Sequence, residues 1–142
     1  MNDSGVLGMP FRIAISLMVI ALMIPAVVSV SHDMDMAADE AEGVSLAEQV
    51  AEATTRAYFS GVGSAVSLSM DIPSGRVLEI GGEGADSYSI RIYSDGRLLG
   101  RVVIDNPPIR MLCRETKIEG EAELLFETVV QDGRVCVAVT AA

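Results

Sequence analysis

The sequence predicts an α+β protein, in which a single N-terminal transmembrane helix with an amphipathic extension precedes a small antiparallel β-sandwich or barrel-like domain. Three observations predict it. Residues 11–30 form one apolar run, residues 31–62 are acidic and rich in helix-forming residues, and residues 63–142 alternate between apolar and polar side chains. Residues 1–10 form a short leader. A chain of 142 residues suits one domain with an anchor and leaves little room for a second core.

The apolar run of residues 11–30 is long enough to cross a membrane, and it carries one charge, Arg12, at its edge. A helix of about 20 residues, rising about 1.5 Å per residue, spans the roughly 30 Å hydrocarbon core of a bilayer. A buried helix of a soluble protein is the alternative, but the rest of the chain is too small to surround so apolar a rod. The positive-inside rule, applied to Arg12, predicts a single-pass protein of the cell membrane with a cytoplasmic N-terminus and an extracytoplasmic domain.

Two fates of this helix stay open. Val27 and Ser29 are small residues that could precede a signal-peptidase cut at Val30, which would release the domain. However, no Lys or Arg precedes Arg12, and the apolar run is longer than the core of a typical secretory signal. We therefore favour a retained helix.

Residues 31–62 predict an acidic helical stalk. The segment holds seven acidic residues against one arginine, so it carries most of the formal net charge of −10. Its Ala, Glu, Gln and Leu content favours a helix over residues 33–59, either continuous or broken near Gly43, and ended by Gly61 and Gly63. An acidic chain repels phosphate backbones, so nucleic acid is not an expected partner.

Residues 63–142 predict a β-rich domain of six or seven short strands. From Val66 to Ile72, apolar residues alternate with polar ones, which is the period of a strand with one buried face. Asp95-Gly96 and Asp132-Gly133 are strong hairpin signals. Short strands separated by such turns are typical of a sandwich or a small barrel. The expected strands are residues 66–72, 77–80, 87–93, 98–104, 109–113, 122–130 and 135–140.

Cys113 and Cys136 are the two cysteines, and each lies in an expected strand. In an oxidising compartment we expect them to form a disulfide, which would stabilise the domain by roughly 3 kcal/mol in the chain-entropy model. Two separate core thiols are the alternative. Two cysteines and the distant His32 do not supply the four ligands of a structural zinc site, so no metal is expected.

No catalytic constellation and no cofactor cradle is evident in the sequence. The single histidine, His32, lies at the expected membrane surface, which argues against a Ser/His/Asp or Cys/His arrangement. The glycine-rich residues 61–65 and 81–85 do not join a strand to a helix, so neither is expected to hold a phosphate. The alternating glutamates of residues 119–123 indicate a solvated strand face. We therefore expect a protein that is not an enzyme and has no cofactor.

The order of a short glycine-containing leader, one apolar helix, an amphipathic extension and a small β-domain resembles that of archaeal type IV pilins and pilin-like proteins, which carry a class III signal peptide. The resemblance covers the layout of the whole chain, and its specific part is residues 1–30. In that family a prepilin peptidase cuts after a glycine just before the apolar segment, which implies Gly5 or Gly8 here. The chain departs from the family pattern because no basic residue precedes either glycine and Arg12 lies in the apolar run.

The resemblance implies a pilin-like, non-catalytic structural or assembly subunit of the cell surface. Its partners would be membrane lipid and, through the N-terminal helix, other copies or other pilin-like subunits. The small residues that would let such helices approach closely are Ala14, Ser16, Ala21 and Ala26. The alternative is a membrane-tethered extracytoplasmic binding module, or a secreted domain if the helix is cleaved. Its recognition loops would be residues 81–86, 105–108 and 114–117.

Overall fold

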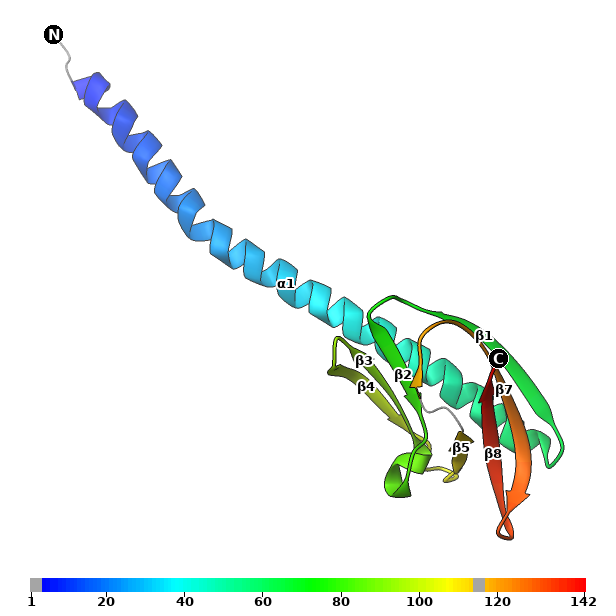
Figure 1. Ribbon diagram of the computed structural model, residues 1–142. Helices are drawn as coiled ribbons and strands as arrows, with labels where there is room; N and C mark the ends of the chain where they lie inside the picture. Colours follow the sequence, from blue (N-terminus) through cyan, green and yellow to red (C-terminus); the bar gives the residue numbers. More distant parts are fainter. Residues whose placement is uncertain (1–3, 114–116) are drawn as a thin grey trace. The chain divides into compact units, whose positions relative to one another are not determined.

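The computed structural model describes residues 4–113 and 117–142, which form one long helix followed by two four-stranded sheets (Figure 1). The helix α1 spans Ser4–Ser60. The chain divides into an N-terminal unit, Met1–Ala38, and a compact unit, Asp39–Ala142. The predicted α+β class, with an apolar N-terminal helix ahead of a β-rich part, is confirmed.

The strands form two separate sheets rather than one closed barrel. The first sheet has the order β1-β7-β8-β5, with β1 at Ala65–Ile72, β7 at Gly120–Gln131, β8 at Arg134–Ala141 and β5 at Met111–Cys113. The second sheet has the order β4-β3-β2-β6, with β4 at Arg97–Val103, β3 at Ser89–Ser94, β2 at Arg76–Ile80 and β6 at Lys117–Ile118. A 3-10 helix, η1, at Gly84–Tyr88, precedes β3.

The expected strands all have counterparts in the sheets, with three differences. The first residues of the expected strand 87–93 belong to η1 instead, and the short strand β6 was not predicted. Strand β5 pairs with β8 in parallel, whereas the domain was expected to be antiparallel throughout. A parallel pair needs a crossover, and here it links segments far apart in sequence. Local alternation carries no information on such a pairing.

Of the two alternatives at Gly43, the continuous helix is the one observed, because α1 runs through this residue. Gly43 is a packing residue: a Cβ atom placed on it would lie 3.1 Å from side-chain atoms of Ile92 and Leu99. The expected end of the helix is confirmed. Gly61 and Gly63 follow Ser60 with φ of 91° and 86°, a left-handed conformation that favours glycine and stops a helix.

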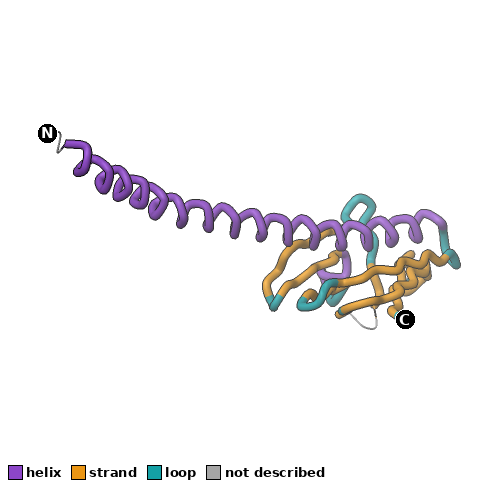
Figure 2. The backbone as a smooth tube through the Cα atoms, turned by 90° about the horizontal axis from the view of Figure 1, so that it is seen from above, coloured by secondary structure: helices purple, strands orange, loops and turns teal. Residues whose placement is uncertain are grey.

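The compact unit is built around the C-terminal part of α1, which lies along one side of the strands (Figure 2). Its buried residues recur every three or four positions, as expected for one helix face. They are small or medium-sized: Gly43, Ala47, Val50, Ala53, Thr54 and Ala57. Together with apolar residues of both sheets they form the hydrophobic core. Part of the expected stalk, residues 31–62, therefore belongs to the core of the β-rich unit.

This helix face contacts both sheets. Toward the second sheet, a Cβ atom on Gly100 of β4 would lie only 2.6 Å from Val44 Cγ2. Toward the first sheet, the Thr128 hydroxyl of β7 donates a 2.7 Å hydrogen bond to the carbonyl of Ala57. The small residues let the helix backbone come close enough for these contacts, so α1 holds the two sheets in one core.

Enlarging Gly100 should separate the helix from the second sheet. We expect Gly100→Val to lower the free energy of unfolding of the full chain by about 1–3 kcal/mol, the usual cost of overpacking. Chemical denaturation in detergent micelles measures it. Adding Val44→Ala should recover part of the loss, whereas the matched enlargement Ala65→Val, at an exposed position of β1, should change little. Equal effects at positions 65 and 100 would contradict the close packing.

Candidate functional site

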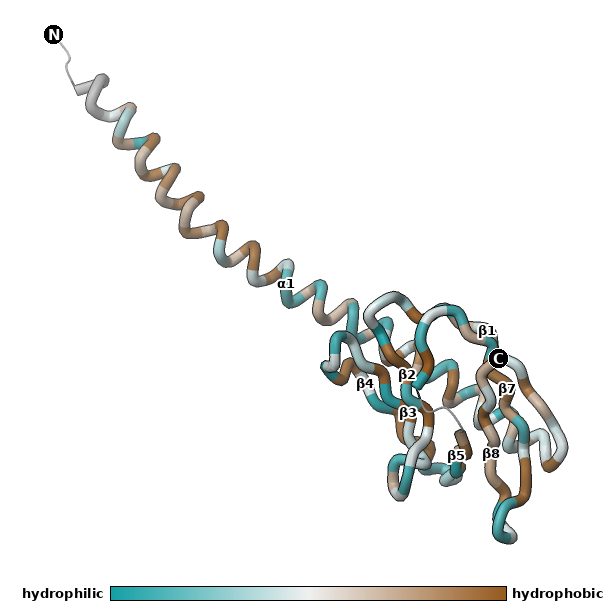
Figure 3. Tube along the Cα trace, viewed as in Figure 1, coloured by the Kyte–Doolittle hydropathy of each residue, from teal (hydrophilic) through white to brown (hydrophobic). Residues whose placement is uncertain are grey.

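The first part of α1 consists mainly of hydrophobic residues (Figure 3), and its large apolar side chains are exposed. It contains one stretch long and apolar enough to cross a membrane by length and composition, and no residue of that stretch is buried. A signal sequence would meet the same two criteria. Phe11, Leu17 and Leu22, for example, are 68%, 60% and 69% exposed. Transfer of such side chains from water to hydrocarbon is favourable, so this surface is suited to lipid or to other helices.

Two hydroxyls at the end of this stretch are bonded within the helix. The Ser29 and Ser31 hydroxyls each donate a 3.0 Å hydrogen bond to a carbonyl in the preceding turn, on Ala26 and Val27. Pro10 and Pro25 lie inside the helix and carry no N–H group. Hydroxyls that are bonded in this way are tolerated in a bilayer.

Two of the four expected contact residues share one helix face. Ala14 and Ala21 lie seven residues apart in α1, which is close to two turns, so they stack on the same side. Ser16 is two residues from Ala14 and lies on nearly the opposite side, and Ala26 is turned away from Ala21. A close helix–helix approach would therefore centre on Ala14 and Ala21.

The two candidate cleavage residues, Gly5 and Gly8, both lie in the first turns of α1. A Cβ atom on Gly8 would meet no atom within 4 Å, so packing does not require glycine there. Cleavage after either residue stays a prediction.

Arg76 of β2 joins the second sheet to α1 at the start of the compact unit. Its side chain is 9% exposed and is directed at two carboxylates of the helix. Nη2 donates a 3.1 Å hydrogen bond to Asp39 Oδ1, and Nη1 lies 2.8 Å from Glu42 Oε2, an ion pair without hydrogen-bond geometry. A charge this buried needs a counter-charge, and the stalk acids supply it.

A second charge network covers the outer face of the second sheet. Arg91 of β3 contacts Asp86 at 2.9 Å and Glu79 at 3.4 Å, and donates a 3.0 Å hydrogen bond to the Gly81 carbonyl. Arg101 extends the network to Asp86 at 3.3 Å. Because these charges satisfy one another, we read the network as structural.

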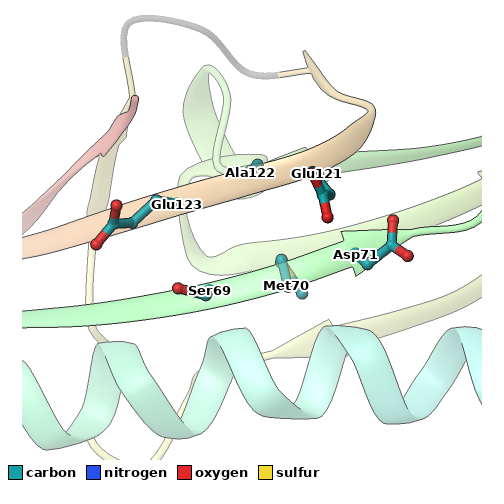
Figure 4. A pocket seen from close by; sticks show the side chains of 6 residues that line it. All are labelled: Ser69, Met70, Asp71, Glu121, Ala122 and Glu123. Atoms are coloured by element: carbon teal, nitrogen blue, oxygen red, sulfur yellow. The ribbon is translucent and has the colours of Figure 1, made fainter.

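A shallow acidic pocket of about 440 Å³ lies on β1 and β7 (Figure 4). Ser69 and Asp71 of β1 line it together with Glu121 and Glu123 of β7. Asp71 lies directly opposite Glu121 in the register, and like charges so placed repel each other. Among the residues that the structure describes, no cation lies within ion-pair distance of Asp71, Glu121 or Glu123. Glu121 and Glu123 of the expected solvated face line this pocket, whereas Glu119 lines another pocket beside Val77 and Lys117.

A basic pocket of about 320 Å³ lies where α1 meets η1 and the start of β8. Its lining includes Tyr58, Tyr88, Arg110, Arg134 and Val135. The sequence does not reveal this grouping, because Arg110 reaches β8 only through the parallel pairing. There the Val137 amide donates a 3.0 Å hydrogen bond to the Arg110 carbonyl.

The expected disulfide between Cys113 and Cys136 is not formed. In the parallel pair, Cys113 lies opposite Val139, three residues beyond Cys136. Three residues of strand correspond to about 10 Å, whereas a disulfide needs Cα atoms within about 7 Å. The two side chains also project from opposite faces of the sheet, because Cys113 shares the face of its partner Val139. The parallel register, which the sequence does not reveal, overturns this expectation.

Two loops of the alternative binding function line two pockets that share Arg110. Gly82 and Glu83 line one pocket, beside Cys113 and Gln131, whereas Pro108 lines the basic pocket. Residues 114–116 of the third loop lie outside the described residues. The described residues of these two loops therefore line neighbouring pockets and do not line the same pocket.

No family model, no curated protein and no solved structure matches this chain. The functional argument therefore rests on the surfaces described above.

Removing the carboxylate partners of Arg76 should lower the free energy of unfolding more than removing the charge of Arg76 itself. We expect Asp39→Asn with Glu42→Gln to lower the free energy of unfolding by about 1–3 kcal/mol, less than for a fully buried pair because both carboxylates are more than half exposed. Arg76→Met should cost less, since it fills the same space without a charge. Denaturation of the full chain in detergent micelles gives both values. Glu52→Gln, which breaks the exposed pair with Arg56, is the control. A larger loss for Arg76→Met would contradict this account.

Proposed function

We propose that this chain is a pilin-like, membrane-anchored structural or assembly subunit of a cell-surface filament, and that it is not an enzyme. The observation that carries the proposal is the dual nature of α1. Its first part is apolar and exposed, and its last part forms the core of the β-rich unit. The chain is helical from Ser4 to Ser60, so no loop separates the two parts.

Lipid and neighbouring helices are the partners that suit the exposed part. The face of Ala14 and Ala21 would allow the helices of two subunits to approach closely, while the larger apolar residues contact lipid or further subunits. Arg12 favours a cytoplasmic N-terminus, with the β-rich unit outside the cell. In this arrangement the helix supplies the assembly contact and the β-rich unit forms the solvent-facing surface.

The state of the N-terminus separates the possible fates of this helix. N-terminal sequencing of the protein isolated from its native membrane should show a start at Val6 or Met9, next to Gly5 or Gly8. An intact N-terminus would favour a simple anchor and the tethered binding module. A start near Val30 would mean a released domain and would end the proposal.

A charge in the middle of the apolar stretch should weaken membrane insertion. We expect Ile20→Arg to oppose insertion by about 2.5–3.5 kcal/mol on the translocon scale, so that the variant shifts from the membrane to the soluble or degraded fraction. Fractionation with alkaline extraction measures this shift. Glu48→Arg, exposed in the compact unit, is the control and should stay in the membrane. Equal membrane retention of the two variants would argue against a spanning helix.

A further inference from the structure

The basic pocket has the composition of a docking site for a carboxylate-rich surface. Arg110 and Arg134 are exposed, and Tyr58, Tyr88 and Val135 provide an apolar and aromatic wall beside them. Within the described part of the chain, no carboxylate lies within ion-pair distance of either guanidinium. In contrast, Arg76, Arg91 and Arg101 each contact a carboxylate of the same chain. The positive charge of this pocket is therefore available to a partner.

The acidic pocket on β1 and β7 has the complementary charge. Asp71, Glu121 and Glu123 are exposed on neighbouring strands without a described cation, and the repulsion between the directly opposed Asp71 and Glu121 is a cost that the single chain bears. A guanidinium placed between them would remove that cost and form charge-assisted hydrogen bonds with the carboxylates.

The two pockets lie at opposite ends of the compact unit. Glu121 is near the start of β7, whereas Arg134 follows the hairpin at the end of β7, where it pairs with Gln131. Ten residues of strand separate Glu121 from Gln131, which corresponds to roughly 33 Å. A single chain therefore cannot close the contact on itself. A contact between different patches on two identical chains is heterologous, and when it does not close into a ring it continues into a filament.

We propose that the Arg110–Arg134 pocket of one copy docks on the Asp71–Glu121–Glu123 pocket of a second copy, forming a head-to-tail contact between compact units. This contact deepens the assembly function and rests on it, because it adds a link between the β-rich units to the link between helices. Its occupant is a second copy of this chain, chosen by charge complementarity. Electrostatic contacts of this kind weaken as salt screens them.

A charge exchange tests the contact in the full chain, purified in detergent micelles. One variant carries Arg110→Glu with Arg134→Glu, and the other carries Asp71→Arg with Glu121→Arg. Analytical ultracentrifugation at low salt should show that each variant alone self-associates on the order of tenfold more weakly than the native chain. Mixing the two variants should restore association, because every contact in the mixture then joins opposite charges. High salt should weaken both the native and the mixed assemblies.

Matched charge reversals outside the two pockets serve as controls. Arg97 and Glu48 are exposed and form no ion pair with described residues. The substitutions Arg97→Glu and Glu48→Arg should therefore leave self-association unchanged. Circular dichroism checks that every variant is folded. Native-like association of either charge-reversed variant alone, or failure of the mixture to associate, would overturn the docking contact.

The result also separates this contact from the helix-mediated assembly. If association survives both charge reversals but is lost in Ala14→Leu with Ala21→Leu, the docking contact is wrong and the assembly function stands. If the native chain is monomeric at every concentration and salt level, both are wrong. If the chain proves to be released by a cut near Val30, the anchored subunit is wrong, and the charge exchange still decides the docking contact.

Discussion

The compact unit depends on the close approach of α1 to both sheets. The helix face is made of small residues, and Gly100 of β4 has no side chain where Val44 passes over it. Larger side chains on either side would push the helix outward and open the core, since protein interiors have little spare volume. The hydrogen bond from Thr128 to the Ala57 carbonyl fixes the helix on the other sheet. Neither sheet has another helix in the described chain to cover its apolar face.

The helix α1 has two different surfaces along its length. Up to Val30 its large apolar residues are exposed, whereas beyond Asp39 its buried residues are mostly small and its large polar residues point outward. The first surface suits lipid or other helices, and the second suits a sheet at short distance. The exposed apolar surface meets the length and composition of a membrane span, a property that a signal sequence shares, and the proposed anchor rests on it.

Charge on the compact unit is distributed in two ways. Arg76 and Arg91 neutralise carboxylates within the chain, so they hold elements together. The pockets around Arg134 and Glu121 carry opposite charges at opposite ends of β7 and are neutralised by no described neighbour. Ion pairs within the chain account for the positions of Arg76 and Arg91, but they do not account for the charges of the two pockets. A polar arrangement of unlike patches on identical chains is the property that head-to-tail association requires.

The class of the fold, the apolar helix, the end of that helix near Gly61 and most strands could be predicted from local patterns, because hydrophobic periodicity and turn residues act over a few neighbouring positions. Tertiary structure decided the role of Gly43, the parallel pairing of β5 with β8, the separation of Cys113 from Cys136, and the grouping of Arg110 with Arg134. Each of these depends on contacts between segments distant in sequence. Such contacts arise from the packing of whole elements, so no local pattern of residues could indicate them.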